Sequence, residues 1–598
     1  MRFRFFAMNL KALRCLPKYP GTRILCVTFI ASRAVFQFTI PHGFGLHLGG
    51  SLYYKFNPLK EKQGLELWTG SSQSLDVAKV WFASCIQSHS DCLPENLKGF
   101  EYPIRLISIG SGILRLVLAS EISYRAPYAT LSHCWGSLIP LRLVNDNITK
   151  LRAGISDSEL CKTFNEAILV ANNLQLDYIW IDSLCIIQDD PEDWLRESAK
   201  MSGVYGCSTI NIAATSAKDG TMGCFFKAAQ AFRIPRAIRG GSEFWDFALF
   251  GPFDAFLCEP LLSRAWVFQE RFLAPRTLHF ASSQIYWECK EAHKCGMFPK
   301  PGQSLRHLGY FTGFPKSIPQ RRNSALWENI VEIYSTGMLT NATDRLVAIS
   351  GVAQWMQAKY KDDYLAGIWR QDMERQLCWQ TKHSSSGELF ISRPKVYLAP
   401  SWSWASILSS IEFMKPDSDI LRTETPLIRV LSAHTILENE YHKFGKVAGG
   451  ALRLVVRYLL CGVEYQKAPF GNICNSSGDP VLYSYRIRWD SPEDPSPRKK
   501  LYLLPVNSSC WDSDQSDDDL GFNGRKTNIK QEKNLVSYTV DGIILEATET
   551  SKMAEYRRVG SWKSGDVKDL EEKSDDSNEL LYEEVEENGT KLRVITII

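Results

Sequence analysis

YIWIDSLCIIQDD, residues 178–190, starts as an apolar run and becomes polar within a few positions. The first residues are apolar on both faces, which is typical of a parallel strand covered by helices on both sides. Asp182, Cys185 and Gln188 follow at its end, and in open α/β sheets ligands gather beyond the carboxyl ends of strands. We interpret these three residues as lining a ligand site. The structural alternative is that Asp182 caps local backbone and Cys185 is an inert core thiol.

The segments around this stretch alternate between strand and helix patterns. Strands are predicted at YATLSHCWG (128–136) and STINIAAT (208–215), helices at 157–174 and from Pro191 onward, and a hairpin at 103–119. Asp190 before Pro191 is a typical cap for the second helix. This alternation predicts an α/β fold with a mainly parallel central sheet flanked by helices.

The rest of the chain predicts further regions of different character. Residues 1–70 are expected to be a poorly structured leader, 71–275 the α/β domain, 276–406 a mixed, largely helical extension, and 407–598 a β-rich C-terminal domain with acidic loops and tail. In the extension, helices are predicted at 323–339, 343–360 and 365–380, and a strand at APSWSWAS (399–406).

The composition narrows the classes of protein that this chain can be. A net charge of +3 over 598 residues provides no electrostatic footprint for nucleic acid. The 16 cysteines are scattered singly, which indicates reduced thiols and a cytoplasmic protein rather than a disulfide framework. The apolar stretch 24–40 is interrupted by Arg33, so no membrane anchor is expected.

A second group of polar residues ends the strand at 128–136. Ser132, Trp135 and Gly136 are expected to open on the same edge of the sheet as the residues after 181. His133 and Cys134 are adjacent in a strand, where side chains point to opposite faces, so they are not expected to act as a catalytic pair.

A third group lies in SRAWVFQERFLAPRTLHF, residues 263–280, which predicts a helix followed by a strand. Trp266, Gln269 and Glu270 share one side of that helix and could face a ligand together, and Arg264, a further candidate, shares another side with Phe268 and Arg271. The alternative is structural, with Glu270 in an ion pair with a neighbouring arginine.

Two sets of residues have the side chains of metal ligands. They are Cys85, His89 and Cys92, and separately Cys289, His293 and Cys295. Neither set has paired C-x-x-C knuckles and each lacks a fourth local ligand, so no metal site is predicted. Zinc shared between the two sets is the alternative.

YATLSHCWG, DYIWIDSLCIIQDDPEDWLRESAKMSGVYGCSTINIAAT and SRAWVFQERFLAPRTLHF resemble, in order and spacing, the three signature blocks of the fungal heterokaryon incompatibility (HET) domain. The resemblance covers about 125–275, and flanking segments extend it to about 75–406. His133 stands where an aromatic residue is commoner in the family, and Ile187 where a polar residue is usual.

The resemblance implies a cytoplasmic protein of filamentous fungi that takes part in non-self recognition, a form of innate immunity with programmed cell death. It also implies a core similar to Toll/interleukin-receptor (TIR) domains, which are flavodoxin-like and some of which cleave NAD with a catalytic glutamate.

Two functions are therefore open. One is a death-triggering module that works by self-association and binding of protein partners, with no cofactor. The other is a TIR-like NAD glycohydrolase with Glu270, or alternatively Asp182, as the catalytic carboxylate and Trp135 or Trp266 stacked on the substrate.

Overall fold

The computed structural model describes most of the chain. The described residues are 14–19, 22–31, 34–40, 68–93, 101–110, 112–122, 125–136, 140–227, 236–240, 243–247, 256–296, 314, 316, 324–382, 393–414, 423–440, 442–465, 472–474, 486–494, 500–512, 536–548, 554–564 and 582–598. They belong to two compact units, one made of residues 1–63 and 229–257, the other of residues 64–228 and 258–598.

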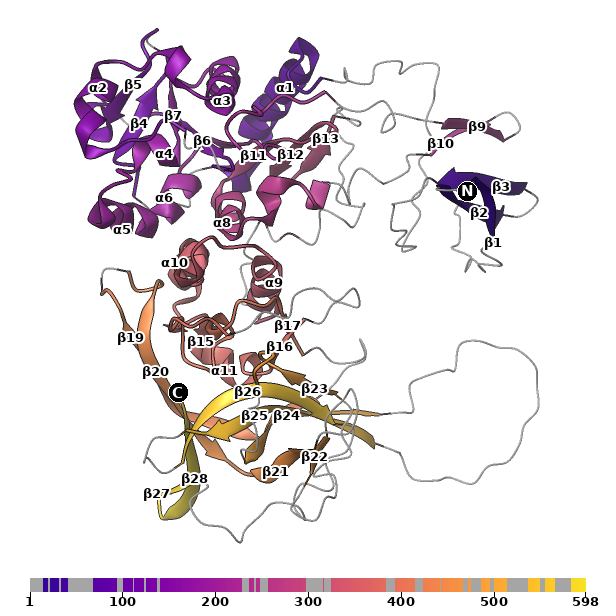
Figure 1. Ribbon diagram of the computed structural model, residues 1–598, viewed down its shortest axis with the longest axis vertical. Helices are drawn as coiled ribbons and strands as arrows, with labels where there is room; N and C mark the ends of the chain where they lie inside the picture. Colours follow the sequence, from indigo (N-terminus) through magenta and orange to yellow (C-terminus); the bar gives the residue numbers. More distant parts are fainter. Residues whose placement is uncertain are drawn as a thin grey trace. The chain divides into compact units, whose positions relative to one another are not determined.

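The smaller unit is made of antiparallel strands. Strands β1 (Arg14–Tyr19), β2 (Thr22–Ala31) and β3 (Ala34–Ile40) form one sheet, and β9 (Arg236–Gly240) pairs with β10 (Glu243–Phe247) (Figure 1). Three strands therefore lie within the segment for which the sequence predicts a poorly structured leader.

The larger unit contains an eight-stranded mixed sheet, in the order β13-β12-β11-β8-β6-β7-β4-β5. Its strands are β4 (Arg105–Ser108), β5 (Arg115–Leu118), β6 (Ala129–Ser132), β7 (Tyr178–Trp180), β8 (Ile210–Ala213), β11 (Arg276–Phe280), β12 (Ile285–Cys289) and β13 (His293–Cys295). The four central strands, β7, β6, β8 and β11, pair in parallel. Both edges are antiparallel.

The prediction of a mainly parallel sheet thus holds for its centre only. At one edge the chain leaves β11 and returns as β12 through a turn of four residues, and so short a connection can join only antiparallel strands. The hairpin of β4 and β5, predicted from the sequence, supplies the other antiparallel edge.

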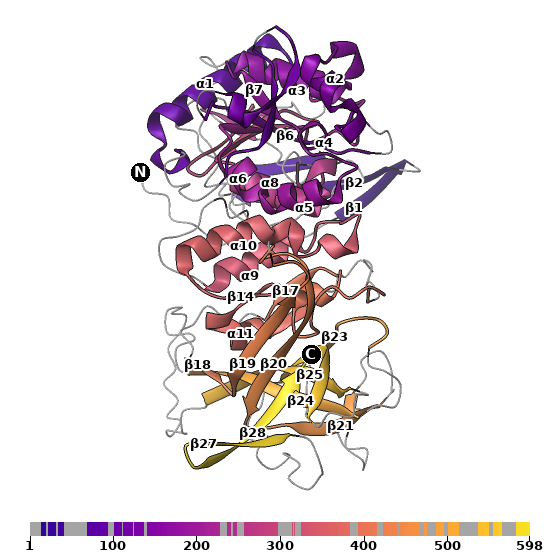
Figure 2. The ribbon, with the colours of Figure 1, turned by 90° about the vertical axis from the view of Figure 1, so that its left-hand side faces the viewer.

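Helices cover both faces of this sheet (Figures 1 and 2). On one face lie α1 (Ser72–Ser88) and α3 (Lys162–Asn173); on the other lie α4 (Asp182–Cys185), α6 (Met201–Gly206) and α8 (Ala265–Leu273). Because both faces are covered, β6, β8 and β11 are buried along their whole length.

The predicted strand at 177–187 is shorter than its apolar run suggests. Strand β7 ends at Trp180, and α4 begins at Asp182. The Asp182 carboxylate accepts a hydrogen bond from the Ser183 amide at 2.7 Å, and the Cys185 amide donates to the Ile181 carbonyl at 2.8 Å. These local bonds start a helical turn in place of further strand.

Helix α5 (Pro191–Ala199) begins as its sequence predicts. The Asp190 side chain accepts hydrogen bonds from the amides of Glu192 and Asp193, and Pro191 occupies the first turn. The Asp193 carboxylate is buried and pairs with Arg105 of β4, which ties the start of the helix to the edge of the sheet.

The helical extension contains two of its three predicted helices, α9 (Ser324–Tyr334) and α10 (Val347–Tyr360). The third prediction, at 365–380, is wrong: β14 (Tyr364–Leu365) and β15 (Ile368–Trp369) form a hairpin, and only α11 (Met373–Gln376) is helical. Gly367 makes the turn at φ +97°, and a Cβ there would lie 2.8 Å from the Trp404 ring.

The strand predicted at 399–406 is also wrong, because the segment forms turns and a 3₁₀ helix at Trp404–Ser406. Its tryptophans pack in the core. The indole nitrogens of Trp404 and Trp327 both donate to the Gly367 carbonyl, at 2.7 and 2.8 Å.

The C-terminal region is rich in β structure, as predicted. Beside the pair β16 (Trp379–Thr381) and β17 (Ile411–Phe413), an 11-stranded sheet contains β18 (Thr423–Pro426), β19 (Ile428–Leu437), β20 (Val447–Val456), β21 (Leu460–Tyr465), β22 (Asn472–Cys474), β23 (Arg486–Trp489), β24 (Leu501–Asp512), β25 (Val536–Ala547), β26 (Glu555–Ser564), β27 (Glu583–Glu587) and β28 (Thr590–Ile597).

Strand β27 lies within the segment predicted to be an acidic tail, and it pairs with β28. The acidic loop predicted at 507–528 is wrong at its start, because residues 507–512 belong to β24 and pair with β25. Residues 513–528 of that loop and 568–581 of the predicted tail lie outside the described residues. Among the residues that are described, no helix is both long and apolar enough to cross a bilayer.

One continuous hydrophobic core runs through the larger unit, from Leu75 on α1 to Ile597 on β28. Arg558 of β26 is fully buried beside it. Its guanidinium donates to both carboxylate oxygens of Asp490, at 3.2 and 3.3 Å, and to the Leu377 carbonyl at 2.6 Å. It also stacks on the Trp379 ring, 3.3 Å from the centroid, so it joins the C-terminal sheet to the segment before β16.

We expect Arg558→Leu to lower the free energy of unfolding by about 3–5 kcal/mol, because it leaves the buried Asp490 carboxylate with Arg393 alone and removes the donor to the buried Leu377 carbonyl. Chemical denaturation of the full chain measures this. Arg453→Leu is the matched control: Arg453 lies on a strand of the same sheet and pairs with Glu583 at the surface, so its loss should cost less than about 1 kcal/mol. Equal effects of the two substitutions would contradict the prediction.

Candidate functional site

The ends of β6 and β7 meet through one hydrogen bond. The Trp135 indole nitrogen donates to the Asp182 carboxylate at 2.8 Å. Trp135 follows β6, and Asp182 opens α4 directly after β7. The Asp182 side chain is 31% exposed and Trp135 is half-buried, so this part of the site reaches solvent. The first two groups of polar residues from the sequence therefore lie together.

His133 lies next to Asp182 but is buried. Its Nδ1 is 3.7 Å from an Asp182 carboxylate oxygen. Burial lowers the pKa of His133 despite that carboxylate, and Arg264 lowers it further, so the imidazole is neutral at pH 7. Its Nε2 has no hydrogen-bond partner among the described residues. Cys134 packs in a separate apolar cluster with Leu261 and Val267, away from the imidazole, as expected for neighbouring strand residues.

Glu270 of α8 belongs to the same group. It is buried, and burial raises the pKa of its carboxyl to about 7 against the opposing effects of the Ser132 hydroxyl and the Arg264 guanidinium. The negative charge of Asp182 raises it further. All three predicted segments thus contribute to one electrostatically coupled group, which we call the carboxylate cluster: His133, Trp135, Asp182, Arg264 and Glu270.

The strands beneath the carboxylate cluster hold a buried polar network. The Asn211 side chain of β8 donates to the Ser132 hydroxyl at 3.0 Å. The Thr130 hydroxyl donates to the side-chain oxygen (Oδ1) of Asn211 at 3.1 Å. The Arg264 guanidinium donates to the His133 carbonyl, which fixes the start of α8 against the end of β6. The Ser132 hydroxyl that this network holds also lowers the pKa of Glu270.

Comparison with known protein families identifies this region. Residues 128–270 match the family model described as heterokaryon incompatibility protein (HET). The chain contains a HET domain. The match starts one residue before β6 and ends at Glu270, so it encloses the whole carboxylate cluster. No curated protein and no solved structure matches the chain.

Some residues predicted for the site lie elsewhere in the HET domain. The Trp266 indole donates to Asp344 at 3.3 Å, and the Gln269 side chain accepts from the Gly351 amide of α10 at 3.2 Å. Both side chains contact the helical extension. Trp266, Gln269 and Glu270 of α8 therefore do not face one ligand together. Helix α8 is buried on nearly all sides. The sequence pattern instead predicts that the side with Trp266, Gln269 and Glu270 faces a ligand.

Three further residues predicted for the site, Cys185, Gln188 and Gly136, serve the packing or the backbone of the fold. Cys185 is fully buried in the core, and burial raises the pKa of its thiol to about 12, which leaves no thiolate to act as a nucleophile. The Gln188 amide donates to the carbonyls of Asp182 and Ile186, so it holds α4 in place. Gly136 has φ +68°, and a Cβ there would lie 2.3 Å from the Asp219 side chain.

The neighbouring arginine on α8 does not pair with Glu270. Arg271 instead makes a bidentate ion pair with the buried Glu288 of β12, at 2.6 and 2.9 Å. His279 lies 3.3 Å from the same carboxylate. Arg271 therefore satisfies Glu288 rather than Glu270, and Arg264 is the arginine whose charge lowers the pKa of Glu270.

Sequence reasoning missed two residues of the site, Asn211 and Tyr205. Tyr205 of α6 is buried, and Glu270 and Asp182 contribute to its raised pKa, after burial itself. From the sequence alone, Tyr205 is interpreted as a core residue on the inner face of a helix. Its hydroxyl could have indicated a polar site nearby, because a buried tyrosine hydroxyl needs a hydrogen-bond partner.

The raised pKa of Glu270 predicts a pH-dependent effect of Glu270→Gln on stability. A carboxyl whose pKa is higher in the folded chain stabilises the fold at low pH, and this contribution is lost as the pH rises through about 7. We expect the variant to exceed wild type in unfolding free energy by up to about 3 kcal/mol at pH 8 and by less than about 1 kcal/mol at pH 5.

Denaturant titrations of both proteins at the two pH values measure the difference. Glu586→Gln is the control, because Glu586 is an exposed carboxyl on β27 and should show no such pH-dependent gain. A Glu270→Gln variant that is less stable than wild type at pH 8 would show that the buried carboxylate is satisfied.

Proposed function

We propose that this protein acts in heterokaryon incompatibility, as a cytoplasmic non-self recognition protein of filamentous fungi that triggers cell death through self-association and partner binding. The observation that carries the proposal is the HET match over residues 128–270. The shared core supports a signalling role, because it connects the HET domain to the C-terminal strands without a break, so partner binding at one can affect the other.

Expression in a filamentous fungus tests this proposal. We expect an inducible full-length copy to arrest growth and kill hyphae, and differently tagged copies to co-purify. Glu270→Gln and Asp182→Asn should still kill, because each substitution preserves the shape of the side chain and a module without turnover does not need the carboxylate charge. Growth unaffected by wild type, with no association between the tagged copies, would overturn the proposal.

A second candidate is a nucleotide glycohydrolase, favoured by the position of Glu270. In its ionised form this buried carboxylate would stabilise the positive charge that develops on the ribose as nicotinamide leaves NAD. Asp182 is the alternative carboxylate, and the half-buried Trp135 could stack on the substrate. Trp266 does not serve this purpose, because its indole is engaged with Asp344.

NAD turnover by the purified chain distinguishes the two candidates. Under the first proposal, we expect NAD incubated with wild type to remain intact over hours. Under the second, NAD would be cleaved with a rate that rises as the pH passes through about 7, where the Glu270 carboxyl ionises. Loss of both cleavage and killing in folded Glu270→Gln would establish the enzyme and displace the first proposal.

A further inference from the structure

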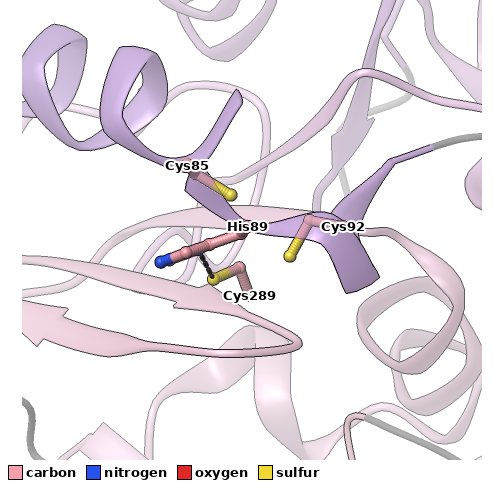
Figure 3. Close-up of side chains that lie close together, drawn as sticks. All are labelled: Cys85, His89, Cys92 and Cys289. Atoms are coloured by element: carbon pink, nitrogen blue, oxygen red, sulfur yellow. Dashed lines mark hydrogen bonds between the residues drawn. The ribbon is translucent and has the colours of Figure 1, made fainter. Parts of the chain in front are cut away.

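Four potential metal ligands come together beside the sheet, and none of them belongs to the carboxylate cluster. They are Cys85 in the last turn of α1, His89 just after it, Cys92 in the following 3₁₀ helix (Ser90–Cys92), and Cys289 at the end of β12 (Figure 3). The sulfur and nitrogen atoms that could bind a metal all lie within 4.8 Å of one another. The three cysteines are buried and His89 is partly exposed.

The local backbone places three of these ligands within eight residues. The His89 amide donates to the Cys85 carbonyl at 3.1 Å and closes the last turn of α1. The Cys92 amide donates to the His89 carbonyl at 3.3 Å and forms the next turn. The pattern C-x3-H-x2-C therefore turns around one point, instead of spreading along a straight helix.

The fourth ligand comes from a distant part of the chain. Cys289 is 200 residues from His89, and their Sγ and Nδ1 atoms are 3.3 Å apart. The tight turn between β12 and β13 presents it: the Cys289 amide donates to the Ala292 carbonyl at 2.9 Å. Packing of α1 against β12 brings the two parts together.

Hydrogen-bond donors lie against two of the sulfur atoms. Arg276 donates from Nε to the Cys85 sulfur at 3.1 Å, and the Ala292 amide donates to the Cys289 sulfur at 3.2 Å. Donors of this kind stabilise negative charge on sulfur and orient metal-bound cysteines.

We propose that Cys85, His89, Cys92 and Cys289 bind a zinc ion. Three thiolates and one imidazole form a Cys3His set, which is a common structural zinc site. In a tetrahedral site with Zn–S bonds of about 2.3 Å, the sulfur atoms lie about 3.8 Å apart, so binding requires only small movements of these side chains. Four protein ligands leave no open position for substrate, and the site is therefore structural.

The arrangement also selects these ligands over the nearby candidates. His293 of β13 faces Glu288, with its Nδ1 3.9 Å from a carboxylate oxygen, and Cys295 pairs with Tyr286 in the hairpin. Neither belongs to the group around Cys289. A disulfide would use two of the three thiols and leave the third thiol and the imidazole without a role, whereas a tetrahedral cation uses all four.

The metal would join the start of the larger unit to one edge of its sheet. Helix α1 contacts both β12 and α3. A zinc ion shared by the end of α1 and β12 would hold this helix on the sheet. The role proposed here does not depend on the function of the carboxylate cluster.

Metal analysis of the full-length protein tests the proposal. The chain is expressed in zinc-supplemented medium, purified under reducing conditions without chelator, and analysed by mass spectrometry of metals. We expect about one zinc ion per wild-type chain. Cys85→Ser, His89→Ala and Cys289→Ser should each lose most of it. Cys295→Ser is the matched control, because Cys295 is a buried thiol of the same hairpin outside the group, and it should keep the zinc.

Cobalt binding keeps the proposal testable if the ligand variants fold poorly. Wild type exchanged into Co²⁺ should show the intense visible bands of tetrahedral cobalt and sulfur-to-cobalt charge transfer. A folded wild-type chain that contains no zinc and takes up no cobalt would overturn the proposal. A disulfide between two of these cysteines in protein kept reduced, or a zinc content unaffected by Cys289→Ser, would overturn it as well.

Discussion

The parallel pairing of β6 with β7 on one side and β8 on the other is the constraint on which the rest of the HET domain depends. Because parallel strands end at one edge of a sheet, this pairing brings Trp135 and Asp182 within hydrogen-bonding distance. It also requires long crossovers, and the crossover after β8 supplies α8 with Glu270. The site is thus a direct result of strand order.

The same constraint sets the electrostatics of the site. Glu270 is buried where the Ser132 hydroxyl and a distant guanidinium are its main stabilising neighbours, while Asp182 adds repulsion. A carboxyl in such surroundings lowers stability when it ionises, and groups of this kind concentrate at functional sites. The buried Arg271 and Glu288 pair shows the contrasting solution on the other side of the same helix, where two charges satisfy each other.

Much of this architecture could be predicted from the sequence, because local patterns dictate it. The cap at Asp190, the hairpin of β4 and β5 and the helix α3 each depend on neighbouring residues. The failures depend on distant ones. A helix at 365–380 is prevented by a turn at Gly367 that packs against Trp404, and Trp266 and Gln269 turn toward an extension that the helix pattern does not show. The sequence also did not show that Cys289 joins Cys85, His89 and Cys92, because Cys289 is 200 residues from His89.

The uninterrupted core between Leu75 and Ile597 affects how the protein can evolve. The HET fold cannot be transferred to another protein as an independent module without exposing the surface of α5, α6 and α8 that α10 of the extension now covers. Residues on the C-terminal strands can likewise change freely only where the packing beneath them is preserved. Substitutions should therefore be tolerated at solvent-facing strand positions and rejected at inward-facing ones.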